Sequence, residues 1–163
     1  MRVIFLDFDG VLNSAASFVM ENRRHGKDKR LKRPLNEHLD RVCTSNFQYI
    51  LDKCPDVKIV ISSTWRIQHS LPWLKKKLKS YGIDASRVIG KTPESFGGFR
   101  GHEISLWLDK HDDVTDYIVI DDNSLLDNTH DNVFIKTSWD TGLTLKHVYE
   151  ALKKFGVELK SEE

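Results

Sequence analysis

Two aspartates that follow a short apolar run near the start of the chain have the types and spacing needed for chemistry. Residues 3–13 read VIFLDFDGVLN. Residues 3–6 are apolar, show no helical period and precede Gly10, which predicts a strand buried on both faces. Residues two apart in extended backbone point the same way, so Asp7 and Asp9 would project toward a common point. Two like charges held there need a cation, a shared proton or an open, wet position.

Polar residues also follow two other apolar runs. Residues 57–61 (VKIVI) are followed by Ser62, Ser63, Thr64, Trp65 and Arg66, and residues 116–120 (DYIVI) by Asp121, Asp122 and Asn123. If these runs are parallel strands, their carboxyl ends meet at one edge of a sheet, where α/β proteins bind ligands. The carboxylates, hydroxyls and arginine would then gather there. Acidic oxygens with open positions suit Mg²⁺, which takes a few carboxylates, waters and a substrate phosphate.

The elements that must position these residues alternate along the chain. Apolar runs predict strands over 3–6, 57–61, 87–90, 116–120 and 132–136, and helical periodicity predicts helices over 36–54, 70–82, 103–110 and 144–156. Such alternation is typical of an α/β fold. We therefore expect a Rossmann-like parallel sheet of about five strands, with helices on both faces.

Length and composition indicate how many domains the chain forms and which class of protein it belongs to. The chain has 163 residues, of which 39% are hydrophobic and 30% charged, which favours a single domain over 1–163. Cys43 and Cys54 fall in one expected helix, too far apart to bridge, so we expect reduced core thiols. The sequence shows no basic-then-apolar leader and no apolar run of transmembrane length. These observations favour a cytoplasmic protein without a membrane partner.

The net charge of +1 conceals an uneven distribution. Residues 21–34 read ENRRHGKDKRLKRP, with seven basic and two acidic residues and a local net charge of +5, whereas the remaining residues carry −4. The basic residues lie within 23–33, and this segment would attract a polyanion such as the backbone of RNA or DNA. Charge runs are also often solvated surface loops, and that alternative stays open.

Four motifs in order resemble the haloacid dehalogenase (HAD) superfamily of phosphohydrolases. They are DFDGV, the serines that end IVISS, a basic residue ahead of a helix, and IDD. The stretches FLDFDGVLN, ISSTWR, RGHEISLWL and TGLT are most similar to the small HAD domain family associated with Swiss Army Knife RNA-repair proteins. The resemblance implies a HAD-like fold and an Mg²⁺-dependent phosphatase that forms an aspartyl-phosphate.

The resemblance also implies roles for the four aspartates. Asp7 would be the nucleophile that attacks phosphorus, and a carboxylate needs no activating base for that step. Asp9 would protonate the leaving oxygen and then deprotonate the hydrolytic water. The metal would be held by Asp7, by the main-chain carbonyl of Asp9, and by Asp122 and Asp121, of which we favour Asp122 for direct contact.

Phosphate binding is assigned by the same resemblance. Ser62 or Ser63 would donate to a phosphoryl oxygen, and we favour Ser62 because it directly follows the apolar run. Arg100, which precedes a helix, is favoured over Lys91 as the cation that balances the charge of nucleophile and phosphate. The further substrate-binding candidates are Gly10, Ser63, Thr64, Arg66 and Lys91.

The space available for a cap bears on the substrate. Residues 14–35 form a basic insertion that is too short to fold as a separate lid, so the fold would have a minimal cap. An open site suits a large substrate such as a phosphorylated nucleic-acid end or a nucleotide. A small-metabolite phosphatase and a non-catalytic phosphate-binding module are the alternatives, and the sequence does not indicate the oligomeric state.

Overall fold

Five parallel strands form one sheet. The computed structural model describes residues 1–25, 37–125 and 128–158. The strands are β1 (Arg2–Leu6), β2 (Lys58–Ile61), β3 (Val88–Lys91), β4 (Asp116–Asp121) and β5 (Phe134–Lys136), in the spatial order β3-β2-β1-β4-β5. All neighbouring pairs are parallel. The predicted α/β fold with a parallel sheet is confirmed.

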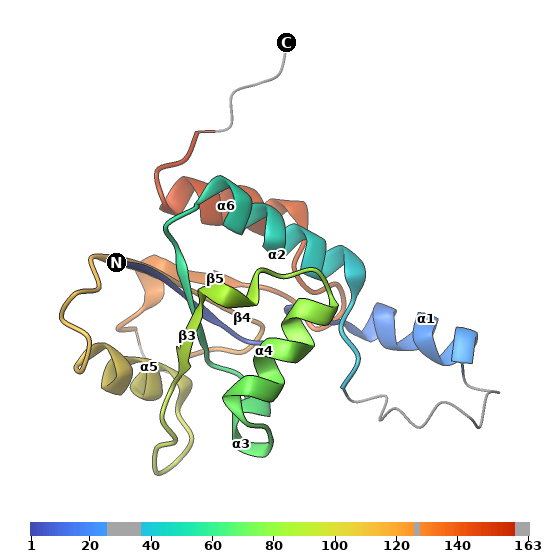
Figure 1. Ribbon diagram of the computed structural model, residues 1–163, viewed down its shortest axis with the longest axis horizontal. Coiled ribbons are helices and arrows are strands. Elements are labelled where there is room, and N and C mark those ends of the chain that lie inside the picture. Colours follow the sequence, from blue (N-terminus) through green and yellow to red (C-terminus); the bar gives the residue numbers. More distant parts are fainter. Residues whose placement is uncertain (26–36, 126–127, 159–163) are drawn as a thin grey trace.

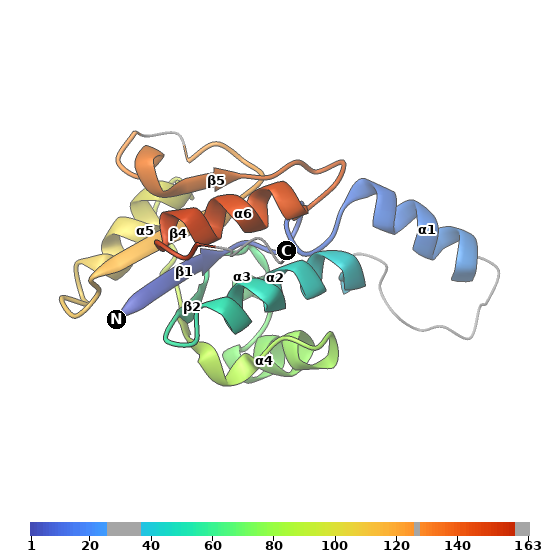
Figure 2. The same ribbon diagram turned by 90° about the horizontal axis from the view of Figure 1, so that it is seen from above.

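Helices cover both faces of this sheet, as predicted (Figure 1). The α-helices are α1 (Ala15–His25), α2 (Arg41–Lys53), α3 (Trp65–Gln68), α4 (Leu71–Ser80), α5 (Arg100–Leu108) and α6 (Leu145–Lys154). Short 3₁₀ turns, η2 (Ala85–Arg87) and η3 (Asp131–Val133), precede β3 and β5. Helices α2 and α6 lie together on one face, and α5 lies on the other (Figures 1 and 2).

Side-chain alternation along the strands separates two apolar clusters. The larger cluster contains Ile4, Leu6, Ile59, Ile61, Ile118 and Ile120 together with residues of α2, α4 and α6. The smaller one contains Val3, Phe5, Val60 and Val119 with Ile104 and Trp107 of α5. Because side chains alternate between faces, Asp7 follows Leu6 onto the α5 face. The sheet therefore directs the first aspartate of the motif toward α5.

Two helix starts differ from the expectation. The helix predicted over 36–54 begins at Arg41, because Asp40 caps it and accepts from the N–H groups of Val42 and Cys43. Val42, an apolar residue in the first turn of α2, is 68% exposed. Helix α5 begins at Arg100 rather than Glu103, so the basic residue that was expected ahead of the helix belongs to its first turn.

The basic insertion contains a helix that the sequence analysis did not predict. Helix α1 occupies residues 15–25 and lies beyond the carboxyl end of β1 (Figure 2). Ser14 and Ser17 stabilise its start, because each hydroxyl accepts from the backbone N–H of the other residue. The remainder of the basic segment, residues 26–36, lies outside the described residues.

In the part of the chain that the structure describes, the helices are all too short or too polar to span a membrane.

Candidate active site

The topology brings the polar strand tails to one edge. The chain moves outward from β1 to β2 and β3, then returns to the other side of β1 as β4, so the switch point lies between β1 and β4. The Asp7 N–H donates to the Ile120 carbonyl at 3.1 Å, and the Ser62 N–H donates to the Leu6 carbonyl at 2.9 Å. These bonds continue the ladder past the strand ends and place the three polar tails together.

Three of the four predicted acidic residues form a compact group. One carboxylate oxygen from each of Asp7, Asp121 and Asp122 lies within 4.8 Å of the others. Asp7 and Asp121 are buried, and Asp122 is half-buried. All three ligand atoms are oxygens, and the group lies at a sheet edge, so this donor set fits a hard divalent cation such as Mg²⁺.

Burial and mutual repulsion alter the acidity of this group. Burial, followed by the charge of Asp121, raises the pKa of Asp7 to about 8. Burial also raises the pKa of Asp121, and the pKa of Asp122 is raised by burial and then by the charge of Asp121. Between pH 3.8 and about 8, Asp7 in the folded protein therefore keeps a proton that it would lose in an unfolded chain, unless a cation replaces that proton.

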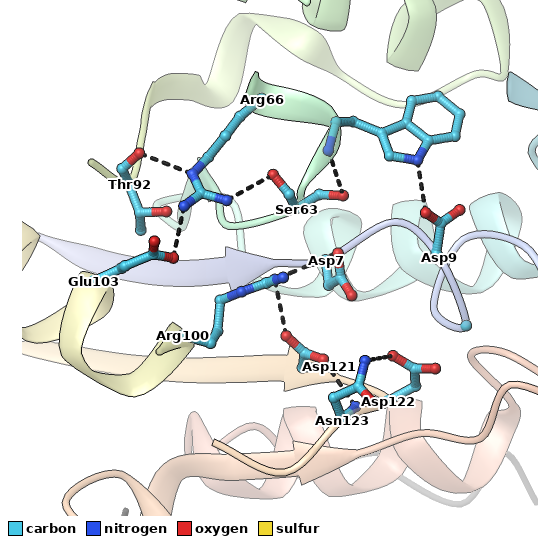
Figure 3. A network of polar contacts seen from close by, with 12 residues as sticks. Asp7, Asp9, Ser63, Arg66, Thr92, Arg100, Glu103, Asp121, Asp122 and Asn123 are labelled. Atoms are coloured by element: carbon cyan, nitrogen blue, oxygen red, sulfur yellow. Dashed lines mark hydrogen bonds and ion pairs between the residues drawn. The ribbon is translucent and has the colours of Figure 1, made fainter. Parts of the chain in front are cut away.

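Arg100 supplies positive charge to two of these carboxylates (Figure 3). Its Nη1 lies 2.9 Å from Asp121 Oδ2 and 3.4 Å from Asp7 Oδ1. The Arg100 charge opposes the rise in the pKa of both groups. Lys91, the other candidate for charge balance, donates from Nζ to the Arg66 carbonyl at 2.7 Å. The structure therefore brings Arg100, rather than Lys91, to Asp7.

Asp9 points away from the three-carboxylate group. Its carboxylate accepts from Trp65 Nε1 at 2.8 Å and from Asn13 Nδ2 at 2.8 Å. Extended backbone was expected to continue through Asp9, but the strand ends at Leu6 and the chain turns at residues 9–12. The Asp9 side chain therefore lies outside the group formed by Asp7, Asp121 and Asp122, and its main-chain carbonyl stays a predicted ligand.

If the protein has the phosphatase activity that the resemblance implies, we expect Trp65→Phe to lower its kcat/KM by about tenfold while the protein stays folded. The change removes the indole N–H that holds one oxygen of Asp9, and a hydrogen bond to a charged group contributes about 1.5–3 kcal/mol. The aromatic contact of residue 65 with Phe8, now 5.2 Å between ring centroids, would be largely kept. Steady-state kinetics with thermal unfolding would test this, and unchanged kinetics would show that Asp9 needs no such donor.

Gly10 permits the close approach of the first loop to β4. Its φ is +71°, and a Cβ atom there would lie 2.3 Å from Asp122 Oδ2. The Gly10 N–H donates to Asn13 Oδ1 at 2.9 Å, and its carbonyl accepts from Thr137 Oγ1 at 2.7 Å. Gly10 was expected to bind substrate, and the structure shows a role in shaping the site. Asn13 and Thr137 were missed, although Asn13 stands in the quoted motif.

The TGLT motif packs against the back of the same loop. Gly142 has a φ of +66°, and a Cβ there would lie 2.7 Å from Cys43 Sγ and 2.9 Å from the Asn13 carbonyl. The Leu143 N–H donates to the Val11 carbonyl at 2.9 Å. This motif therefore supports the loop that carries Asp9, and only a glycine fits the contact.

The structure brings Ser63, rather than the favoured Ser62, to Asp7. A hydrogen bond from the Ser63 side chain lowers the pKa of Asp7, and Ser63 Oγ also accepts from the Trp65 N–H at 3.3 Å. Ser62 Oγ is buried and has no hydrogen-bond partner among the described residues. The chain turns into α3 directly after β2, which rotates the second serine toward Asp7.

Arg66 is a buried support rather than a free donor (Figure 3). Its guanidinium donates to the carbonyls of Ser63, Thr92 and Pro93, and its Nη2 pairs with Glu103 Oε2 at 2.6 Å. It is 3% exposed and does not reach Asp7 in the structure. It connects the tail of β2 to α5, the helix that carries Arg100, so breaking this buried pair would be strongly destabilising.

A parallel α/β sheet with acidic strand ends at its switch point, a neighbouring hydroxyl and a helix-borne arginine defines the class of HAD-type phosphohydrolases in general. Residues 3–148 match the family described as "HAD domain in Swiss Army Knife RNA repair proteins", and the chain belongs to this family. The predicted resemblance is therefore confirmed. Neither a search of curated proteins nor a search of solved structures found a match.

Proposed function

We propose that this protein is an Mg²⁺-dependent phosphatase that forms an aspartyl-phosphate on Asp7. The observation that carries the proposal is the placement of Asp7 at the switch point. It is a buried carboxylate that pairs with Arg100 and lies close to the carboxylates of Asp121 and Asp122, and a hydrogen bond from Ser63 lowers its pKa. A binding module would need the cation and the phosphate donors, but not a buried nucleophile beside them.

Four residues divide the chemistry between them. An oxygen of Asp7 attacks phosphorus, the bond from phosphorus to the leaving oxygen breaks, and Asp9 gives that oxygen a proton. A water then attacks the aspartyl-phosphate, Asp9 takes its proton, and the bond to Asp7 breaks to release phosphate. Arg100 and Ser63 hold phosphoryl oxygens in both steps.

Mg²⁺ would be held by Asp7, Asp122, Asp121 and the Asp9 carbonyl, and when bound it would neutralise charge on the phosphoryl group. The contact of Asp121 Oδ2 with Arg100 leaves this residue less free than Asp122 for direct coordination. Asp122, the favoured direct ligand, is hydrogen-bonded only by the Asn123 amide among the described contacts.

The leading substrate is a nucleic-acid end or a nucleotide phosphate. The description of the matched family, which names RNA repair, supports this choice. So does the basic segment, of which Arg23 and Arg24 are exposed on α1 while residues 26–36 lie outside the described part. Arginine and lysine side chains without base-reading geometry bind the phosphate backbone.

A substrate screen tests the proposal. Phosphate release with Mg²⁺ would be measured from 3′- and 5′-phosphorylated RNA and DNA oligonucleotides, mononucleotides, sugar phosphates and a small aryl phosphate. Among these substrates, we expect kcat/KM to be highest for one that contains a nucleotide. A higher value for a sugar phosphate would favour the small-metabolite alternative. Stoichiometric phosphate binding without turnover of any substrate would favour the non-catalytic module.

We expect Ser63→Ala to lower kcat/KM by about ten- to a hundredfold, because it removes a donor to phosphoryl oxygen. Ser62→Ala is the matched control, since it deletes the same group one residue away. It removes a buried hydroxyl without a partner among the described residues, so its stability should be unchanged or higher. A larger kinetic loss in the Ser62 variant would return the phosphate role to Ser62.

A further inference from the structure

A small polar cavity adjoins Asp9, and its lining does not include Asp7, Asp121 or Asp122. It has a volume of about 170 Å³ and is lined by Asp9, Glu37, Thr64, Trp65, Gln68 and His69. Trp65, Gln68 and their neighbours in α3 form one wall, and Glu37, which precedes α2, forms another. Of these residues, only Asp9 has a role in the proposed chemistry, and Thr64 is a predicted substrate-binding residue.

The cavity matters because of the role proposed for Asp9, so the inference rests on the proposed function. A general acid must come within hydrogen-bond reach of the oxygen that it protonates. The atoms attached to the leaving oxygen then lie next to Asp9. The cavity is lined by Asp9 itself, so it lies where the first part of the leaving group emerges from the site.

The lining suits neutral hydroxyl groups. Asp9 and Glu37 offer carboxylate oxygens, which accept hydrogen bonds, and the six lining residues, all in the described part, include no lysine or arginine. A second phosphate would therefore be repelled. The side chains of Thr64 and Gln68 are exposed and have no hydrogen-bond partner among the described residues, so both are available to a ligand.

The walls of the cavity are held in place. The His69 ring stacks on Trp73, with 3.7 Å between centroids and an interplanar angle of 9°. His69 Nε2 also lies 3.3 Å from Glu37 Oε1, which ties α3 to the residue before α2. Trp65 is fixed by its hydrogen bond to Asp9. A subsite built from fixed side chains discriminates better than one that must form on binding.

The volume limits the ligand to one ring. The cavity has a volume of about 170 Å³. It is smaller than the roughly 300–1,000 Å³ of sites that enclose drug-sized ligands. A pentose fits this space, whereas a whole nucleoside does not, so an attached base would lie outside the cavity.

We propose that this cavity is the subsite for the sugar of the leaving group, and that Glu37 and Gln68 bind ribose hydroxyls. A carboxylate that accepts from a ribose 2′-hydroxyl loses this partner when the sugar is deoxyribose, and sites built around such a bond reject the analogue that lacks it. The enzyme would therefore prefer RNA ends to DNA ends of the same sequence. Ribose is common to 3′- and 5′-phosphorylated ends.

The experiment compares kcat/KM for matched RNA and DNA oligonucleotides, each phosphorylated at the 3′ or the 5′ end, and for a small aryl phosphate. We expect the wild type to prefer RNA by about tenfold or more at the end whose ribose enters the cavity. Glu37→Ala and Gln68→Ala should each reduce this RNA-to-DNA ratio, mainly by raising KM for RNA. Glu158→Ala is the control, because Glu158 is exposed beyond α6, far from Asp9 in the fold.

The outcomes separate the two proposals. Turnover of phosphate monoesters without an RNA preference would overturn the sugar subsite and leave the phosphatase standing. No turnover of any substrate by the wild type would overturn both. An equal fall for RNA, DNA and aryl phosphate in a variant with wild-type thermal unfolding would place that residue in the chemistry, and would also overturn sugar recognition. If Glu37→Ala alone unfolds, Gln68→Ala decides.

Discussion

Asp7→Asn is expected to reduce turnover of every phosphorylated substrate by at least about four orders of magnitude, without unfolding the protein. The amide keeps the shape of the side chain but is a poor nucleophile, so the aspartyl-phosphate cannot form at a useful rate. The backbone bond from residue 7 to the Ile120 carbonyl is untouched. The measurement is single-turnover and steady-state phosphate release with Mg²⁺ present.

The stability of the same variant distinguishes lost chemistry from lost structure. Burial raises the pKa of Asp7 to about 8, so a carboxylate here opposes folding at neutral pH in the absence of a cation. An uncharged amide removes this cost, and the metal-free variant should therefore melt at or above the wild-type temperature. Asp112→Asn changes an exposed residue before the amino end of β4, and it should alter neither the turnover nor the melting temperature. Near-normal turnover by Asp7→Asn would refute covalent catalysis.

The parts of the site that depend on strand order were predictable from sequence. An apolar run that ends in Asp7, and another that ends in Asp121 and Asp122, specify where a parallel sheet must place them. Arg100 could be anticipated because it stands at the start of a helix that runs toward β4. Such features need only the period of the strands and the rule that parallel strand ends share an edge.

The parts that depend on the backbone beyond the strand ends were not predictable. Ser62 and Ser63 differ by one residue of register, and the turn into α3 decides which of them meets Asp7. Asp9 points to Trp65 because Gly10 turns the chain, which ends the two-residue alternation. A pattern in the sequence carries no record of either turn, since both are fixed by contacts with other elements.

Arg66 shows the same limit for a charged side chain. Its sequence position, directly after the serines, suggested a phosphate ligand. Its partners are instead Glu103, 37 residues further along the chain, and carbonyls of the segment after β3. Only the folded chain brings these groups together. The more buried arginine, Arg66, therefore holds the helix from which Arg100 reaches Asp7.

Removal of the divalent cation is expected to abolish turnover as completely as loss of the nucleophile. Excess chelator should stop phosphate release, and Mg²⁺ should restore it, because Arg100 pairs with Asp7 and Asp121 and no ion pair reaches Asp122 among the described residues. Ca²⁺ should bind but support little turnover, since its looser, higher coordination misplaces the reacting groups. Asp122→Asn should require far more Mg²⁺ for half-maximal activity, whereas Asp112→Asn should not.

The stabilisation by Mg²⁺ should grow as the pH rises. Burial raises the pKa of Asp7, Asp121 and Asp122 above the unfolded value of 3.8, for Asp7 to about 8. Between those values the metal-free folded state binds more protons than the unfolded state, so its stability falls as the pH increases. Mg²⁺ competes with these protons and binds only the folded group, which gives about 2.7 kcal/mol at a hundred times its Kd. Thermal unfolding at pH 5 to 8, with and without Mg²⁺, measures the increase in Tm that Mg²⁺ causes at each pH. An increase that does not change with pH, or no increase, would contradict this prediction.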